Sequence, residues 1–134
     1  AMGAGYGVAE NGSAADTSDG DDKHMTAFAN YSIGPVTLGY QLSEIQAGAK
    51  GTANQQASAF GIAFNVNDNL SISYGEREVE FETNDNVTED GEGIAIAYTM
   101  GSIKIAGNRN EGSDIGGTTG SNDQMTEIAV SFAF

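Results

Sequence analysis

The sequence predicts an all-β protein whose strands form an antiparallel transmembrane β-barrel. The first observation is an alternation of apolar and polar residues with period two, which marks strands with two different faces. The second is that short turns alternate with long polar loops along the chain. The third is the composition, since 19 glycines, one proline and 39% hydrophobic residues suit a sheet with an apolar outer face and a wet inner face.

Eight segments of the chain carry the alternation. It is clearest at the end, where Ile128, Val130, Phe132 and Phe134 fall on one face and small or polar residues on the other. Two segments fit less well: the first has glycine along one face, and the second places Phe28 on the polar side. The expected strands cover residues 1–10, 24–33, 36–46, 55–66, 70–82, 93–100, 102–111 and 123–134.

The connections between these segments alternate in length. Residues 34–35, 67–69 and 101–102 have the composition of tight hairpin turns, and longer polar loops are expected near 11–23, 47–54, 83–92 and 112–122. Short turns on one rim and long loops on the other are typical of outer-membrane barrels, in which the turns face the periplasm. The last strand then runs inward and leaves Phe134 at the periplasmic rim.

Charge and residue usage exclude several function classes. Acidic residues outnumber basic ones by 19 to 5, so the chain lacks the Lys/Arg clusters that nucleic-acid binding needs. There is no cysteine, and His24 is the single histidine, so neither a thiolate site nor a histidine-based triad can be assembled. No run of about 18 apolar residues predicts a transmembrane helix, and no signal peptide is visible at Ala1. We expect no enzyme and no cofactor.

The acidic loops invite comparison with calcium sites. Residues 16–22 are rich in aspartate, but Ala15 and Thr17 occupy positions where an EF-hand loop needs ligands, and residues 84–91 fail in a similar way. No metal site is therefore predicted. Weak binding of divalent cations by these carboxylates stays open.

The end of the chain resembles the C-terminal signature of Gram-negative outer-membrane proteins. In that signature the chain ends on Phe and carries apolar or aromatic residues at every second position before it. Phe134, Phe132, Val130 and Ile128 match, and Thr126 fits less well. The resemblance implies that this strand is the assembly signal read by the barrel-assembly machinery. The rhythm of strands, turns and loops along the whole chain is similar to the C-terminal half of general diffusion porins, those of alphaproteobacterial type above all.

The resemblance implies a homotrimer in the outer membrane. Each barrel would have about sixteen strands around a water-filled channel for passive diffusion of small hydrophilic solutes and ions. The first eight strands and the constriction loop of such porins have no counterpart in this sequence. The first expected strand also lacks a preceding polar turn, because Ala1 already lies inside its stripe. We therefore expect this chain to be part of a larger barrel.

Four residues are candidates for lining the pore, because they fall on the polar side of their strands: Gln41, Asn65, Lys104 and Glu127. Their charges would tune ion preference. An equally acceptable interpretation is that Lys104 and Glu127, on neighbouring antiparallel strands, neutralise each other. Arg77 falls on the same side, but three glutamates surround it, so solvation is its expected role.

Aromatic residues gather near the short-turn ends of the strands that run inward. Tyr31, Phe64 and Tyr98, together with Phe132 and Phe134, are expected to form a periplasmic aromatic girdle, because amphipathic rings favour the membrane interface. The preference of aromatic residues for strands would explain them as well. Arg109 falls on the outward side, so it should lie at the outer rim or follow a bulge.

Two other functions remain open at this stage. The chain could be a complete eight-stranded barrel that serves as a structural or adhesive membrane anchor, although small inner residues would pack such a barrel poorly. It could also be a soluble extracellular β-protein with calcium-stabilised acidic loops. The expected partners of the leading hypothesis are membrane lipid, the assembly machinery, further copies of the chain and small hydrophilic solutes, with no nucleic acid.

Overall fold

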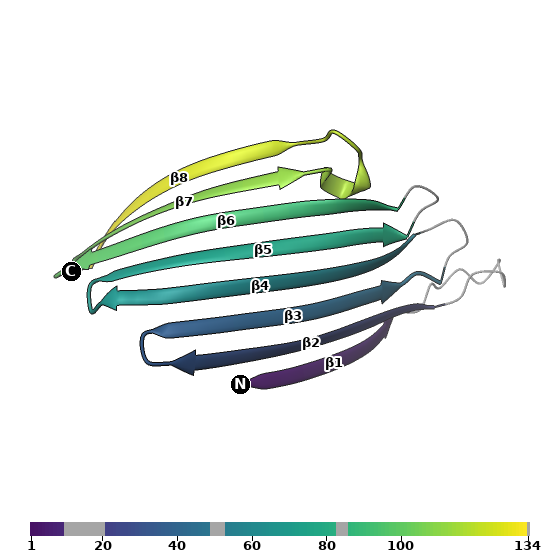
Figure 1. Cartoon of the computed structure of the whole chain (residues 1–134), viewed down its shortest axis with the longest axis horizontal. Coiled ribbons are helices and arrows are strands. Elements are labelled where there is room, and N and C mark those ends of the chain that lie inside the picture. Colours follow the sequence, from purple (N-terminus) through teal and green to yellow (C-terminus); the bar gives the residue numbers. More distant parts are fainter. Residues whose placement is uncertain (10–20, 49–52, 83–85, 134) are drawn as a thin grey trace.

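One antiparallel sheet of eight strands makes up the structure, a computed structural model that describes residues 1–9, 21–48, 53–82 and 86–133. The strands follow one another in chain order, so each pairs with the next (Figure 1). They are β1 (Met2–Ala9), β2 (Asp22–Ile33), β3 (Val36–Gln46), β4 (Asn54–Asn67), β5 (Leu70–Glu82), β6 (Val87–Met100), β7 (Ile103–Ser113) and β8 (Asp123–Phe132), with a short 3₁₀ turn η1 (Ile115–Gly117). The predicted all-β class is confirmed. The sheet is open, however, because β1 and β8 form its two edges and do not pair.

The predicted strand bounds agree best where the apolar alternation is strongest. Strands β3 and β5 begin and end at the predicted residues. The predicted loop at 83–92 is wrong over most of its length, because β6 begins at Val87. The reason is that backbone pairing with β5 continues as far as Phe81 and Val87 although the side chains have turned acidic.

The other predicted loops are also shorter where the structure describes them. Strand β2 begins at Asp22, β4 begins at Asn54 and β7 extends to Ser113, so the last connection covers residues 114–122. The remaining parts of the loops near 11–23 and 47–54 include residues 10–20 and 49–52, which lie outside the described residues.

Three tight turns lie at one end of the sheet, which we call the turn end, and the connection that carries η1 lies at the opposite loop end (Figure 1). Gly34 and Gly101 have positive φ values of 55° and 59°, which a two-residue hairpin turn needs and glycine adopts without strain. In the remaining turn, between β4 and β5, the side-chain oxygen of Asn67 accepts hydrogen bonds from the backbone N–H groups of Asn69 (2.9 Å) and Leu70 (3.0 Å). The residue types in the turns thus set the register of each hairpin.

The described part of the sheet has almost no interior. Val79, with 2% of its surface exposed, is the one buried apolar residue among those described, whereas most large apolar residues are at least 36% exposed. An open single sheet leaves these apolar side chains uncovered, and an apolar surface of this kind is typical of an interaction site.

Candidate functional site

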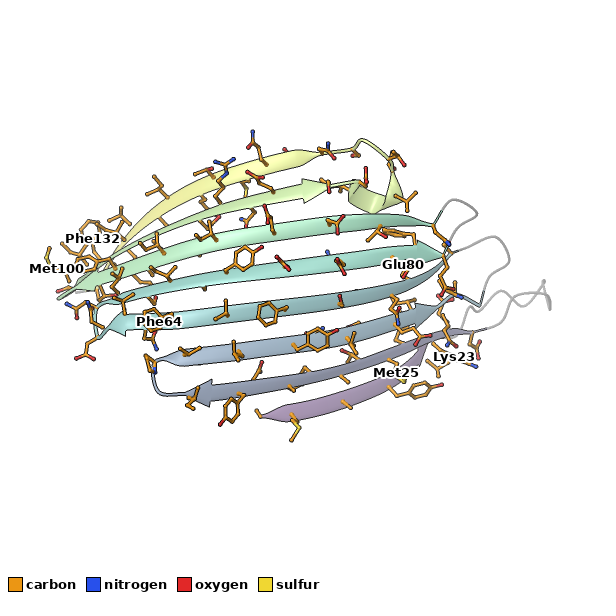
Figure 2. All side chains as sticks on the ribbon, viewed as in Figure 1. Lys23, Met25, Phe64, Glu80, Met100 and Phe132 are labelled. Atoms are coloured by element: carbon orange, nitrogen blue, oxygen red, sulfur yellow. The ribbon has the colours of Figure 1, made fainter. Side chains whose placement is uncertain are left out.

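One face of the sheet, which we call the apolar face, carries most of the large apolar side chains, and all eight strands contribute to it. The strand registers place Leu38 opposite Tyr31 and Ile62, and Ile96 opposite Ile72, so the stripes of neighbouring strands join into one band. In Figure 2, Phe64, Met100 and Phe132 mark this band toward the turn end, and Met25 marks it toward the loop end. The band comprises Met2, Tyr6, Met25, Tyr31, Ile33, Val36, Leu38, Tyr40, Leu42, Phe60, Ile62, Phe64, Leu70, Ile72, Tyr74, Ile94, Ile96, Tyr98, Met100, Ile103, Ile105, Ile128, Val130 and Phe132.

The same face becomes acidic toward the loop end. On β5 the change occurs between Tyr74 and Glu76, and the Tyr74 hydroxyl lies within hydrogen-bond distance of both Glu76 and Glu92, the latter at 3.1 Å. We call the acidic residues beyond the band the acidic collar, and they are Glu76, Glu78, Glu80, Asp90, Glu92 and Glu111. A hollow of about 780 Å³ lies among these strands, and most of its acidic lining belongs to the collar.

The edge of the apolar band that lies nearer the loop end runs diagonally across the strands. One row of register partners crosses seven strands and serves as a reference: Tyr31, Leu38, Ile62, Tyr74, Ile94, Arg109 and Thr126. On β2 the first charged residue beyond this row, Lys23, lies eight residues away from Tyr31; on β3 the distance falls to six residues and on β5 to two. On β7 the charged residue Arg109 stands in the row itself.

This drift has a direction and a size that can be compared with known geometry. With ~3.4 Å per residue and strands ~4.8 Å apart, a shift of eight residues over the five strand spacings from β2 to β7 gives an angle of roughly 45–50° between the strands and the normal to the band. The turn end moves in the same sense, because Ile33, Leu70 and Ile103 lie progressively farther from the reference row. The band is therefore a belt that crosses the strands obliquely.

The opposite face, which we call the small-residue face, carries mainly glycine, alanine, serine and asparagine. Its most regular feature is a glycine row of Gly39, Gly61, Gly75 and Gly93, which are direct partners across β3, β4, β5 and β6. Asn30 and Asn110 continue the row at its two ends. The amide oxygen of Asn30 lies 2.8 Å from the position that a Cβ on Gly39 would take, so the larger side chain fills the space that the glycine leaves.

All four predicted pore-lining residues lie on the small-residue face, as their phase indicated. Gln41 pairs with Ala59, Asn65 with Ser71, Lys104 with Ser131, and Glu127 with Asn108. The interpretation that Lys104 and Glu127 neutralise each other is contradicted by this register. Glu127 lies four residues from the partner of Lys104, about 14 Å along the strand. The carboxylate of Glu127 instead accepts a hydrogen bond from Asn108 at 3.5 Å.

The residues of the predicted girdle lie on the apolar face. Tyr31, Phe64, Tyr98 and Phe132 belong to the turn half of the band, and each is at least 41% exposed. Of the predicted assembly signal, Ile128, Val130 and Phe132 share this face on the edge strand β8, while Phe134 lies outside the described residues. The sequence interpretation missed a second aromatic group, Tyr40, Phe60 and Tyr74, nearer the acidic collar, which the register reveals.

The two arginines differ in their surroundings. Arg77 lies on the small-residue face and forms an ion pair with Glu89 at 3.3 Å, so its expected role of solvation alone is incomplete. Arg109 lies on the apolar face at the edge of the band. It contacts the carboxylate of Glu111, and its guanidinium donates a hydrogen bond to Gln124 at 3.2 Å. The register of β7 is regular there, so Arg109 fits the predicted rim position without a bulge.

Toward the loop end the small-residue face also carries larger apolar side chains. There Val79, Phe81 and Val87 point to this face, and residues 114–122, which we call the strap, contact it at Phe81 and Glu89. A Cβ on Gly117 would stand 3.0 Å from the ring of Phe81, and the N–H of Gly116 donates a hydrogen bond to Glu89 at 2.9 Å. The sequence interpretation described this stretch as a polar loop and had no signal for its docking.

Among the residues that the structure describes, no group of three or more His, Cys, Asp or Glu side chains is arranged to hold a metal ion. In the same part of the chain, no helix is long and apolar enough to cross a membrane. A second hollow of about 460 Å³ lies along β1, β2 and β3, lined by Ala4, Met25, Ala27 and Leu42 among others.

No protein-family model, curated protein or solved structure matches this chain. Its function is therefore inferred from the two faces of the sheet and from the resemblance of its terminal strand.

Proposed function

We propose that this chain forms part of the wall of a bacterial outer-membrane porin, a β-barrel that lets small hydrophilic solutes and ions diffuse passively through a water-filled channel. The apolar face would contact lipid, and the small-residue face would line the water. Diffusion through such a channel would involve no chemical step and no cofactor.

The observation that carries the proposal is the oblique apolar belt. Strands of membrane barrels tilt by roughly 35–45° from the barrel axis, and a lipid-facing band perpendicular to that axis must cross the strands at the same angle. The edge that runs from Lys23 on β2 to Arg109 on β7 has a slope close to this range.

The residue types on the small-residue face support a wide, wet interior. A closed barrel of about eight strands is filled by its own side chains, whereas barrels of about sixteen strands leave an aqueous channel. The glycine row and the alanines beside it, such as Ala59 and Ala95, could not fill a small barrel without voids. This favours the larger barrel, of which β1 to β8 would be the C-terminal half.

The open edges fit the same arrangement. Strand β1 runs toward the loop end and β8 runs away from it, so further antiparallel strands can continue the sheet on either side. Unpaired N–H and C=O groups at a sheet edge are not tolerated in the hydrocarbon region, so in a membrane both edges must be paired. By the resemblance, the barrel-assembly machinery would recognise β8, and the finished barrel would join two further copies as a homotrimer.

Single-channel conductance in a planar bilayer tests the proposal, with the full-length protein extracted from membranes in detergent. We expect large, ohmic open steps. If the protein folds into a heat-modifiable barrel but gives no steps, it is a membrane anchor without a channel. If it is extracted without detergent and its melting temperature depends on calcium, the soluble β-protein is the correct interpretation.

A further inference from the structure

We propose that the strap, residues 114–122, is a movable gate at the loop-end mouth, with Glu89 as its latch. The inference rests on the proposed channel, because it assigns the small-residue face to the lumen. It concerns a different property, however, which is a switch between a docked and a released state of this mouth.

The docked state is held by contacts of two different kinds. Gly117 lies against the ring of Phe81, at the point where a Cβ would stand only 3.0 Å from its Cγ and Cδ2 atoms. The N–H of Gly116 donates a hydrogen bond of 2.9 Å to Glu89 Oε2, while Glu89 Oε1 lies 3.3 Å from Arg77 Nη1. The Glu89 carboxylate thus joins the strap to the guanidinium of Arg77 on the neighbouring strand β5.

The strap is also held together internally, so it can move as a unit. The N–H of Gly120 donates to the Asp114 side chain at 2.6 Å, the N–H of Ile115 to the carbonyl of Ser121 at 2.9 Å, and the N–H of Ser121 to the carbonyl of Thr118 at 3.0 Å. Against these internal bonds stand, among the described contacts, one hydrogen bond from Gly116 to Glu89 and two small apolar contacts, Gly117 with Phe81 and Ile115 with Gly112 of β7. The weaker set lies between strap and wall, so that is where opening would occur.

Docking places Gly116 and Gly117 against Glu89 and Phe81 on the small-residue face. Val79 is 2% exposed, and the Glu89 side chain is 20% exposed against 59% for Arg77. Because these residues face the proposed lumen at the loop end, the docked strap narrows that mouth and its release widens it. A channel with such an element should show two conductance levels.

Two pairs of matched variants in the full chain test the gate. Gly117 and Gly120 both have positive φ values, 71° and 81°, but a Cβ on Gly120 meets nothing within 4 Å and its N–H donates to Asp114 within the strap. G117A therefore disturbs docking, and G120A controls for backbone strain in the strap. E89A removes the latch, and D90A, a carboxylate on the opposite face of the same strand, controls for lost charge.

The readouts are hydrogen exchange of the strap amides in the detergent-folded protein and single-channel conductance. We expect G117A and E89A to shift the ratio of docked to released states about tenfold or more, since a hydrogen bond to a charged group is lost or a contact is displaced. Exchange of the strap would rise, and the lower conductance level would become rarer. G120A and D90A should leave the ratio of docked to released states unchanged.

Two results would overturn the gate in distinguishable ways. If the wild type conducts and its levels are the same in all four variants, the channel stands and the gate does not exist. If strap exchange responds to G117A and E89A but no variant and no wild type conducts, the proposed channel itself fails, and the gate with it.

Discussion

The ring of Phe28 lies over Gly3, its direct partner on the edge strand β1. Only 2.5 Å separates the Cε1 atom of Phe28 from the position that a Cβ on Gly3 would take. Phe28 is the residue that broke the alternation in the sequence. It fits on the small-residue face because glycine leaves room for it, as an aromatic ring that covers a glycine on a neighbouring strand does in other sheets.

We expect G3V to destabilise the pairing of β1 with β2 by about 1–3 kcal/mol, because the ring must move or the strand must shift. Gly7 lies on the same face of the same strand, and a Cβ there meets nothing within 4 Å. G7V should therefore be neutral or slightly stabilising, since valine favours strands. Urea unfolding of the detergent-folded protein compares the two, and equal losses would contradict this account of Phe28.

The lipid contact of the apolar face is tested by one charge placed on either side of β6. Ile96 lies on the apolar face opposite Ile72, and Ala97 lies on the small-residue face opposite Ala106. I96R should cost about 2–4 kcal/mol in folding into lipid vesicles, whereas A97R should be tolerated. If the protein were soluble, arginine in place of the half-exposed Ile96 would cost little, and the difference between the two variants would vanish.

The slope of the belt predicts an orientation that can be measured directly. Polarised infrared spectroscopy of oriented bilayers containing the protein should give a strand tilt of about 35–45° from the membrane normal. Strands lying parallel to the membrane plane would show that the sheet lies on the bilayer instead of crossing it.

The height of the belt predicts a preference for thin membranes. On β3 the apolar stripe from Val36 to Leu42 covers seven residues, or ~24 Å along the strand, and at the slope of the belt roughly 17 Å along the membrane normal. That is less than the band of about 25 Å found in membrane barrels. Folding should be faster and more complete in vesicles of short-chain lipids than in those of long-chain lipids, as measured by heat-modifiable mobility on gels.

The separation of Lys104 and Glu127 predicts additive effects on ion preference. K104Q should raise the preference for cations and E127Q should lower it, as measured by the reversal potential across a salt gradient. Because the residues stand about 14 Å apart along the sheet, the double variant should equal the sum of the single ones. A large deviation from additivity would restore the interpretation of a mutually neutralising pair.

The sequence predicted the parts of this fold in which side-chain polarity and backbone structure agree. Strands β3 and β5 were predicted with their observed bounds because stripes such as Val36 to Leu42 end at recognisable turns. The start of β6 could not be found in this way. Thr88, Asp90 and Glu92 look like loop residues, yet they continue a strand because β5 supplies their hydrogen-bond partners.

The candidate site shows the same division. The phase of Gln41, Asn65, Lys104 and Glu127 followed from alternation within each strand, so their common face was predictable. Which residues stand opposite one another depends on the register across a hairpin. The oblique edge of the apolar band and the docking of the strap depend on contacts between segments, to which the sequence of a single segment gives no access.

The glycine row divides each of four strands into two mechanical parts. On β5 and β6, Gly75 and Gly93 stand between the last apolar residue, Tyr74 or Ile94, and the first glutamate of the acidic collar. Glycine has no side chain to pack and often marks a bend in a strand. We therefore expect the charged ends of these strands to bend about this row more readily than the apolar belt bends.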